Sequence, residues 1–134
     1  GFKIYSGGTD THLMLVDLRP FNVKGNLASE SLCRANITCN KNGIPFDTEK
    51  PMITSGIRLG SQAATTRGFG LKEFEKVGEL ITKVIKGLSE NPDDNSKVEN
   101  EVRNEVVNLC SNFPIYKNLN KWFALVKKKV KLQL

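Results

Sequence analysis

One stretch of this chain repeats its apolar residues with the period of an α-helix. Between Lys72 and Leu88, apolar side chains recur at intervals of three and four residues. That spacing gathers them on one stripe of an amphipathic helix, which is stable when the stripe is buried against another layer. The residues of the stripe are Phe74, Val77, Leu80, Ile81, Val84, Ile85 and Leu88.

A second helix is predicted after the helix-breaking segment Asn91–Asn95. Ser96 and Glu99 have the spacing of a capping box, which marks a helix start, and Pro114 marks the end. The apolar faces of the two helices need to be buried against another layer of the fold. The residues predicted to be buried along the second helix are Val98, Val102, Val106, Leu109 and Phe113.

Apolar segments near the start of the chain are predicted as strands. His12–Leu18 suits a strand covered on both faces, and it ends at Arg19-Pro20 because proline cannot donate to a sheet ladder. Lys3–Ser6 is predicted as the neighbouring strand. A modest helix up to Asn36 then follows, and its inward residues are predicted to be Leu27, Ala28, Leu32 and Ala35.

A long loop separates two further short strands, which are predicted at Ile37–Asn40 and Gly56–Gly60. The loop, Lys41–Ser55, is dense in turn-forming residues. A long loop inside a small domain is a candidate for a functional segment. Strands that alternate with helices predict an α/β fold, in which helices pack on one face of a small sheet.

Length and composition fit one domain. The chain has 134 residues, of which 39% are apolar, enough for one core and too few for two. It contains no run of about eighteen apolar residues, and Gly1–Ser6 lacks the layout of a signal peptide. The expected protein is therefore soluble and cytoplasmic.

The cysteines and the charge exclude some classes of function. Cys33, Cys39 and Cys110 are odd in number and form no close pair, so they are predicted to be small buried hydrophobic residues. The net charge of +6 is concentrated in the lysines after residue 126. A short lysine run without interleaved aromatic residues gives nucleic-acid binding little support.

Few residues have the spacing of a catalytic set. The single histidine, His12, could act in proton transfer, but a lone histidine is more often structural. The segment Ser6-Gly7-Gly8-Thr9 leads into a strand and not into a helix, so a turn is favoured over a phosphate loop. The aspartates lack the spacing of metal ligands, and no metal site is expected.

Two residues are ambiguous from the sequence alone. Arg58 lies between Ile57 and Leu59, where a guanidinium is costly to bury unless it binds a carboxylate or phosphate with both arms. A structural ion pair with an internal acidic residue explains Arg58 equally well. Asn42 could recognise the polar edge of a heterocycle or merely cap its own turn.

Three separated blocks together resemble the bacterial type of serine hydroxymethyltransferase. The resemblance extends over Gly1–Tyr116, and the tail at 117–134 has no counterpart that we recognise. The matching segments are Ser6-Gly7-Gly8-Thr9-Asp10, His12-Leu13, Leu15-Val16-Asp17-Leu18, Ala35-Asn36-Ile37-Thr38, Asn40-Lys41-Asn42, Ile44-Pro45-Phe46-Asp47, Thr54-Ser55-Gly56-Ile57-Arg58-Leu59-Gly60, Thr65-Thr66-Arg67-Gly68-Phe69 and Phe113-Pro114-Ile115-Tyr116.

The resemblance implies a fold and an activity. It implies the C-terminal small domain of an enzyme that uses pyridoxal phosphate to interconvert serine and glycine, with tetrahydrofolate as carrier of the one-carbon unit. Such domains have a small, mainly antiparallel sheet with helices on one face. The domain is expected to occupy residues 1–116. The cofactor lysine of the family lies upstream, so this chain alone is expected to be inactive.

The resemblance also implies roles for particular residues. Arg58 matches the arginine that binds the carboxylate of the amino acid. Asn42 matches a residue that contacts the pteridine of the folate, and Lys50, Pro51 and Met52 match a segment of the same folate site. Met52 stands where an aromatic residue is more usual. The complete enzyme is expected to be a homodimer, whereas the isolated domain is expected to be a monomer.

Two alternatives remain open at this point. One is a free-standing basic module that derives from the enzyme domain and binds nucleic acid through its tail. The other is a related aminotransferase, whose C-terminal domain also carries a carboxylate-binding arginine. The segment Asn40-Lys41-Asn42 argues against the second alternative.

Overall fold

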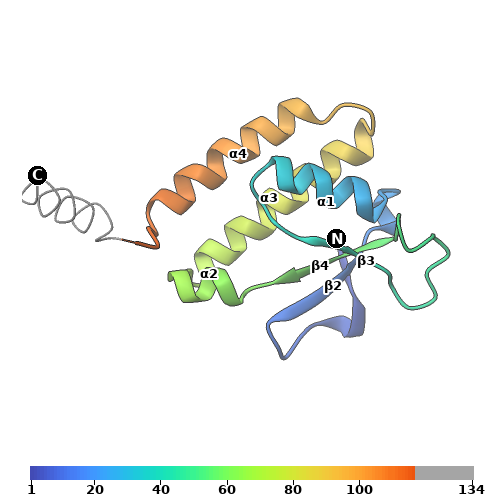
Figure 1. Cartoon of the computed structure of the whole chain (residues 1–134), viewed down its shortest axis with the longest axis horizontal. Coiled ribbons are helices and arrows are strands. Elements are labelled where there is room, and N and C mark those ends of the chain that lie inside the picture. Colours follow the sequence, from blue (N-terminus) through green and yellow to red (C-terminus); the bar gives the residue numbers. More distant parts are fainter. Residues whose placement is uncertain (117–134) are drawn as a thin grey trace, which may run out of the picture.

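A computed structural model describes residues 1–116 of the chain, and the predicted tail at 117–134 lies outside the described residues. Short strands come first and longer helices follow (Figure 1). The elements are β1 Lys3–Ile4, a 3-10 turn at Tyr5–Gly7, β2 Leu13–Asp17, a second 3-10 turn at Arg19–Phe21, α1 Gly25–Arg34, β3 Asn40–Asn42, β4 Gly56–Gly60, α2 Gln62–Arg67, α3 Leu71–Glu90 and α4 Ser96–Ser111.

Within residues 1–116 the sheet has four strands in the order β1-β2-β4-β3, and every neighbouring pair is antiparallel. In the central pair, Val16 lies opposite Ile57 and Leu15 lies opposite Arg58. Helices α1, α3 and α4 lie on the same side of this sheet (Figure 1). The predicted α/β class, with an antiparallel sheet and helices on one face, is confirmed.

The core lies between this sheet and the helices. Helix α3 contains the whole predicted stripe, and its residues from Leu80 to Leu88 that point inward are buried. They pack with apolar residues of β2, β4, α1 and α4 in one cluster. Burial of each such side chain stabilises the fold by about 1.5–3 kcal/mol relative to exposure. The prediction of this helix from apolar spacing is confirmed.

A buried carboxylate joins α1 to α4. Glu99 accepts a hydrogen bond of 2.6 Å from the Ser31 hydroxyl and two of 2.7 Å from the Arg34 guanidinium. Asn95 donates to the Ser31 oxygen and to the backbone carbonyl of Val84 on α3. The Arg34 guanidinium, together with the Ser31 hydroxyl, holds the pKa of Glu99 below its usual value despite burial.

The predicted capping box at Ser96 and Glu99 is wrong. Helix α4 begins at Ser96 itself, with Asn95 as the N-cap, and the Glu99 side chain points inward and not back to the helix start. The sequence spacing was misleading because a glutamate near a helix start can serve either purpose. Here the inward polar group of Ser31 and the cation of Arg34 offer it better partners.

The third strand is displaced from its predicted position. It spans Asn40–Asn42 and not Ile37–Asn40. Just after α1, Asn36 lies in the left-handed region, and the backbone amides of Asn36 and Ile37 donate hydrogen bonds to the carbonyls of Cys33 and Leu32. This Schellman closure uses Ile37 to cap the helix, so the extended chain begins later.

Smaller predictions are also corrected. The cysteines are not buried: Cys33 is exposed, and Cys39 and Cys110 are half-buried. Leu27 was predicted to point inward, but it lies at the edge of the α1 apolar face and is 38% exposed. Strand β1 ends at Ile4, because Ser6 and Gly7 adopt positive φ. The short helix α2 was not predicted, since its sequence has no apolar periodicity.

We predict that Glu99→Ala lowers the free energy of unfolding by about 2 kcal/mol, because the Ser31 hydroxyl and the Arg34 guanidinium lose their carboxylate partner. Urea unfolding of the 134-residue chain, followed by circular dichroism, measures this loss. The matched control is Glu101→Ala on the exposed side of α4, whose surface ion pair with Lys83 is worth less than about 1 kcal/mol. Equal losses in the two variants would contradict a structural role for the buried carboxylate.

Candidate functional site

A cleft of about 480 Å³ lies at the end of the sheet, over the face that the helices do not cover. Its walls come from β2, β3, β4 and the segment between β1 and β2. Polar groups line it from several parts of the chain. They include Tyr5, Thr9, Asp10, Asn42 and Arg58.

Strand alternation directs Arg58 into this cleft. Successive side chains of a strand point to opposite faces, and in β4 the neighbours Ile57 and Leu59 face the helices. Arg58 is exposed, and within residues 1–116 its guanidinium forms no ion pair. A structural ion pair, the alternative left open by the sequence, is therefore not found in the described part of the chain.

Asn42 lies in β3 and lines the same cleft as Arg58. The strand partner of Arg58 in β3 is Asn40, so Asn40 and Asn42 share the face from which Arg58 projects. The Asn42 amide nitrogen donates a hydrogen bond of 2.7 Å to the backbone carbonyl of Gly43. The structure thus brings together two of the residues predicted from the sequence, and Asn42 also forms the local turn contact.

The other predicted folate residues lie further out. Lys50, Pro51 and Met52 are exposed in the loop between β3 and β4, and none of them lines the cleft. His12 is exposed immediately before β2, and its backbone carbonyl accepts a hydrogen bond from the backbone amide of Ser61. The Ser6–Thr9 segment forms a turn, as predicted, at the mouth of the cleft.

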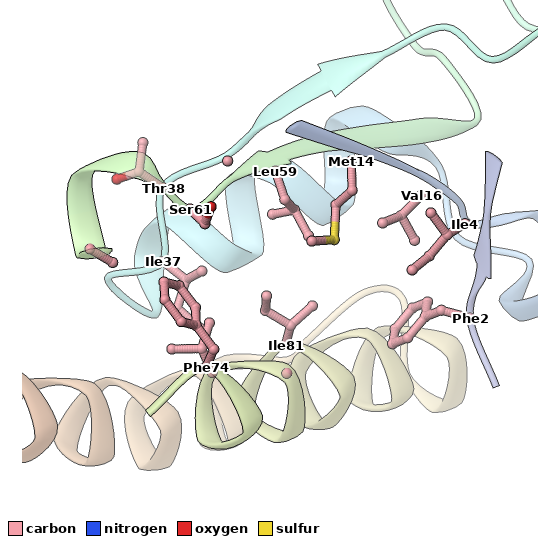
Figure 2. Close-up of a pocket in the computed structure, with 14 residues that line it drawn as sticks. Phe2, Ile4, Met14, Val16, Ile37, Thr38, Leu59, Ser61, Phe74 and Ile81 are labelled. Carbon is pink, nitrogen blue, oxygen red and sulfur yellow. The ribbon is translucent and has the colours of Figure 1, made fainter. Parts of the chain in front are cut away.

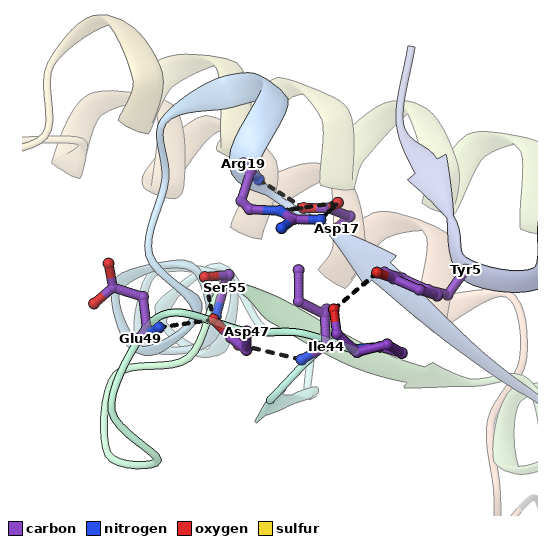
Figure 3. Close-up of polar contacts among 8 residues, drawn as sticks. Tyr5, Asp17, Arg19, Ile44, Asp47, Glu49 and Ser55 are labelled. Carbon is purple, nitrogen blue, oxygen red and sulfur yellow. Dashed lines mark hydrogen bonds and ion pairs between the residues drawn. The ribbon is translucent and has the colours of Figure 1, made fainter.

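The carboxylate of Asp47 organises the loop between β3 and β4 (Figure 3). It accepts hydrogen bonds from the backbone amides of Ile44, Glu49 and Ser55 and from the Ser55 hydroxyl, at 2.6–3.2 Å. Partial burial would raise the pKa of Asp47, but these hydrogen bonds outweigh it and hold the pKa well below the usual range. The sequence pattern places Asp47 among the turn-forming residues of the loop, but it does not reveal that backbone amides are its partners.

The far end of the loop is fixed to the start of α1. The backbone amides of Gly25 and Asn26 donate hydrogen bonds of 2.9 Å to the carbonyls of Thr54 and Ile53. The approach is so close that a methyl group on Gly25 would lie 2.1 Å from the Thr54 hydroxyl oxygen. Only glycine fits at this position without displacing the loop.

A third contact ties the loop to the first strands. The Tyr5 hydroxyl donates a hydrogen bond of 3.0 Å to the carbonyl of Pro45, and Tyr5 also lines the cleft (Figure 3). Beside it, Arg19 forms a two-armed ion pair with the buried Asp17, at 2.7 Å for the shortest contact. The Arg19 guanidinium lowers the pKa of Asp17. Tyr5 was not singled out from the sequence, since nothing local reveals a partner forty residues away.

A second cavity, of about 410 Å³, lies between the sheet and α3 (Figure 2). Its walls are mainly apolar, and no titratable side chain lines it. It lies on the opposite side of the sheet from Arg58. Such a cavity has no group for proton transfer, so the polar cleft is the better candidate for chemistry. Residues that line it include Phe2, Met14, Leu59, Phe74 and Ile81.

Within residues 1–116, no group of three or more histidine, cysteine or acidic side chains could hold a metal ion. None of the described helices is long and apolar enough to cross a membrane.

The fold and the cleft define a class of protein: a small two-layer α/β domain that presents an arginine and an amide on its uncovered sheet face. A sequence model described as serine hydroxymethyltransferase matches residues 1–81. The chain belongs to the serine hydroxymethyltransferase family.

Individual relatives agree with this assignment. A serine hydroxymethyltransferase of Pelagibacter ubique is 88% identical over 119 residues, which are 89% of this chain and 27% of that protein. Relatives of the same name from a Marinomonas species and from Paramagnetospirillum magneticum are each 65% identical, over 87% of this chain. The chain spans only about a quarter of the length of these relatives.

We predict that Asp47→Asn destabilises the chain by about 1–2 kcal/mol at neutral pH, because an amide cannot accept all four hydrogen bonds. The pKa of Asp47 is lowered by folding, so this stabilisation is present above the ordinary pKa of about 4 and is lost as pH falls toward the folded value. Urea unfolding of both proteins at several pH values measures the difference.

The exposed Asp93→Asn is the matched control for Asp47→Asn, and we expect it to change stability little at any pH. A difference between wild type and Asp47→Asn that stayed constant from pH 7 down to pH 2 would contradict a role for the charged carboxylate.

Proposed function

We propose that this chain is the part of a serine hydroxymethyltransferase that binds the substrate carboxylate and contacts the folate. The observation that carries the proposal is the cleft on the uncovered sheet face, where Arg58 and Asn42 lie together. The reaction is the interconversion of serine and glycine, with tetrahydrofolate as carrier of the one-carbon unit. Serine, glycine and tetrahydrofolate are thus the small-molecule partners.

In this proposal, Arg58 binds the carboxylate of serine or glycine. A guanidinium presents parallel donors that match the two oxygens of a carboxylate, so it fixes both position and orientation. Its strand position suits this task, because a side chain on a paired strand is held more firmly than one on a loop. An amino acid held by its carboxylate keeps its reacting carbon in a constant place, which accelerates the chemical step.

Asn42 is proposed to contact the pteridine ring of tetrahydrofolate. An amide offers one donor group and one acceptor, which is the pattern of a pteridine edge. In the described residues one N–H of the Asn42 amide donates to Gly43, so the oxygen and the second N–H are available for a ligand. Lys50, Pro51 and Met52 are proposed as outer contacts of the same folate site. Their exposure is compatible with contacts of this kind.

The cleft residues do not fit pyridoxal phosphate, the cofactor that the family implies. The cofactor is attached through a lysine, and no lysine of residues 1–116 lines the cleft. In the proposal, the cofactor and its lysine belong to the remaining three quarters of the protein, the complete enzyme is a cytoplasmic homodimer, and the present chain alone is an inactive monomer.

We predict that Arg58→Ala in the full-length protein lowers kcat/KM for serine by roughly 10²–10³-fold, because both charge-assisted hydrogen bonds to the carboxylate are lost. Arg58→Lys keeps the positive charge but loses the planar guanidinium, so its kcat/KM for serine is expected to fall less than that of Arg58→Ala. Steady-state conversion of serine to glycine with tetrahydrofolate measures both. The 134-residue chain, assayed alone, provides the blank.

Arg103→Ala is the matched control, because this exposed arginine lies on α4 and, within residues 1–116, donates to the Arg34 carbonyl and does not line the cleft. Unchanged turnover in Arg58→Ala would exclude Arg58 as the carboxylate ligand. An inactive wild-type full-length protein would refute the proposed function itself.

A further inference from the structure

The tip of the loop between β3 and β4 is a tight turn of an uncommon composition. Asp47 donates a backbone hydrogen bond of 3.0 Å to the carbonyl of Ile44, which closes a four-residue turn. Pro45 occupies the second position and Phe46 the third, with φ of 58°. Proline cannot adopt positive φ, so this is a type II turn. The third position of a type II turn favours glycine or asparagine, and a bulky side chain there is strained.

The side chain of Phe46 gains nothing from the described fold. It is 96% exposed, so no packing within residues 1–116 offsets the strain. Thr54, at the other end of the same loop, makes a useful contrast. It also has positive φ, at 61°, but it is buried and its hydroxyl donates to the Gly56 carbonyl. The conformation of Thr54 is explained by its contacts, whereas that of Phe46 is not.

The turn that carries Phe46 is held firmly beside the cleft. Tyr5 donates to the carbonyl of Pro45, and Asp47 accepts amide hydrogen bonds on both sides of the turn (Figure 3). Pro45 itself lines the cleft that contains Asn42 and Arg58. An exposed phenyl ring is thus presented at the rim of the candidate site by a turn with fixed geometry.

We infer that Phe46 forms an aromatic wall of the folate site, and that its ring packs on the flat conjugated rings of tetrahydrofolate. The inference rests on the proposed function. Of the three proposed small-molecule partners, serine and glycine have almost no apolar surface, so the folate is the one that gains from contact with a phenyl group. Aromatic rings in contact attract each other beyond the area they bury. Met52, in the same loop and 74% exposed, adds a second apolar side chain that a folate could cover.

Three substitutions in the full-length protein test this inference. Phe46→Asn removes the ring and relaxes the turn, Phe46→Ala removes the ring and keeps the strain, and Phe46→Tyr keeps the ring. We expect KM for tetrahydrofolate to rise roughly ten-fold in the Asn and Ala variants, with KM for serine unchanged, and to stay near wild type in the Tyr variant. Calorimetric titration with tetrahydrofolate in the presence of glycine measures the same loss without turnover.

The melting temperature of the 134-residue chain separates strain from binding. Phe46→Asn is expected to raise the melting temperature by roughly 3–5 °C, because asparagine tolerates positive φ. Phe46→Ala is expected to leave the melting temperature unchanged. Leu71→Asn, which changes an 85% exposed side chain on α3, is the matched control and should leave KM for tetrahydrofolate unchanged.

The outcomes distinguish this inference from the proposed function. If the wild-type protein converts serine with tetrahydrofolate but the Asn and Ala variants bind the folate as tightly as wild type, the inference is wrong and the function stands. The same holds if these variants instead weaken assembly of the full-length protein, because Phe46 then packs on another protein surface. If the wild-type protein neither binds tetrahydrofolate nor converts serine, the proposed function and the inference on Phe46 are both wrong.

Discussion

The register between β2 and β4 decides which residues face the helices and which face the cleft. Val16 lies opposite Ile57, and both are buried against the helices. Leu15 precedes Val16 in β2 and Arg58 follows Ile57 in β4, so both must point to the uncovered face. A slip of one residue would bury the guanidinium of Arg58 and expose Ile57, which the apolar core under the sheet opposes. The packing of α3 and α1 against β4 therefore also fixes the orientation of Arg58, far from any contact with it.

Polar contacts hold the loop between β3 and β4 in place, whereas apolar packing holds the sheet. The loop between β3 and β4 has few apolar residues, and it is held by the carboxylate of Asp47, by the start of α1 at Gly25 and by the hydroxyl of Tyr5. Each anchor comes from a different element, so the loop can have a defined shape without a core of its own. Hydrogen bonds of this kind contribute modestly one by one, at about 1 kcal/mol, but together they restrict the backbone enough to hold Phe46 in a strained turn.

The sequence predicted the parts of this fold that follow from periodicity. The stripe of α3, the strand around Arg58 and the placement of helices on one face all follow from local spacing and from the need to cover a sheet. It failed where a residue had two possible partners: Glu99 has the spacing of a cap but binds Ser31 and Arg34, and Ile37 closes a helix although it is a good strand residue. In the candidate site, Arg58 and Asn42 stood out by residue type and family resemblance, whereas Tyr5 and Asp47 act through long-range or backbone contacts that a sequence pattern does not display.

The open position of Arg58 has a consequence for how such a site can work. A guanidinium in contact with water binds a carboxylate weakly, since exposed ion pairs contribute less than about 1 kcal/mol. The same pair becomes much stronger when water is excluded, because the effective dielectric constant falls. In the proposed function, the uncovered sheet face must therefore be closed by another part of the protein for the carboxylate clamp to be effective. The helices lie on the opposite side of the sheet and cannot provide that cover, so the remainder of the protein would have to supply both the reactive cofactor and the low-dielectric surroundings in which Arg58 binds its substrate.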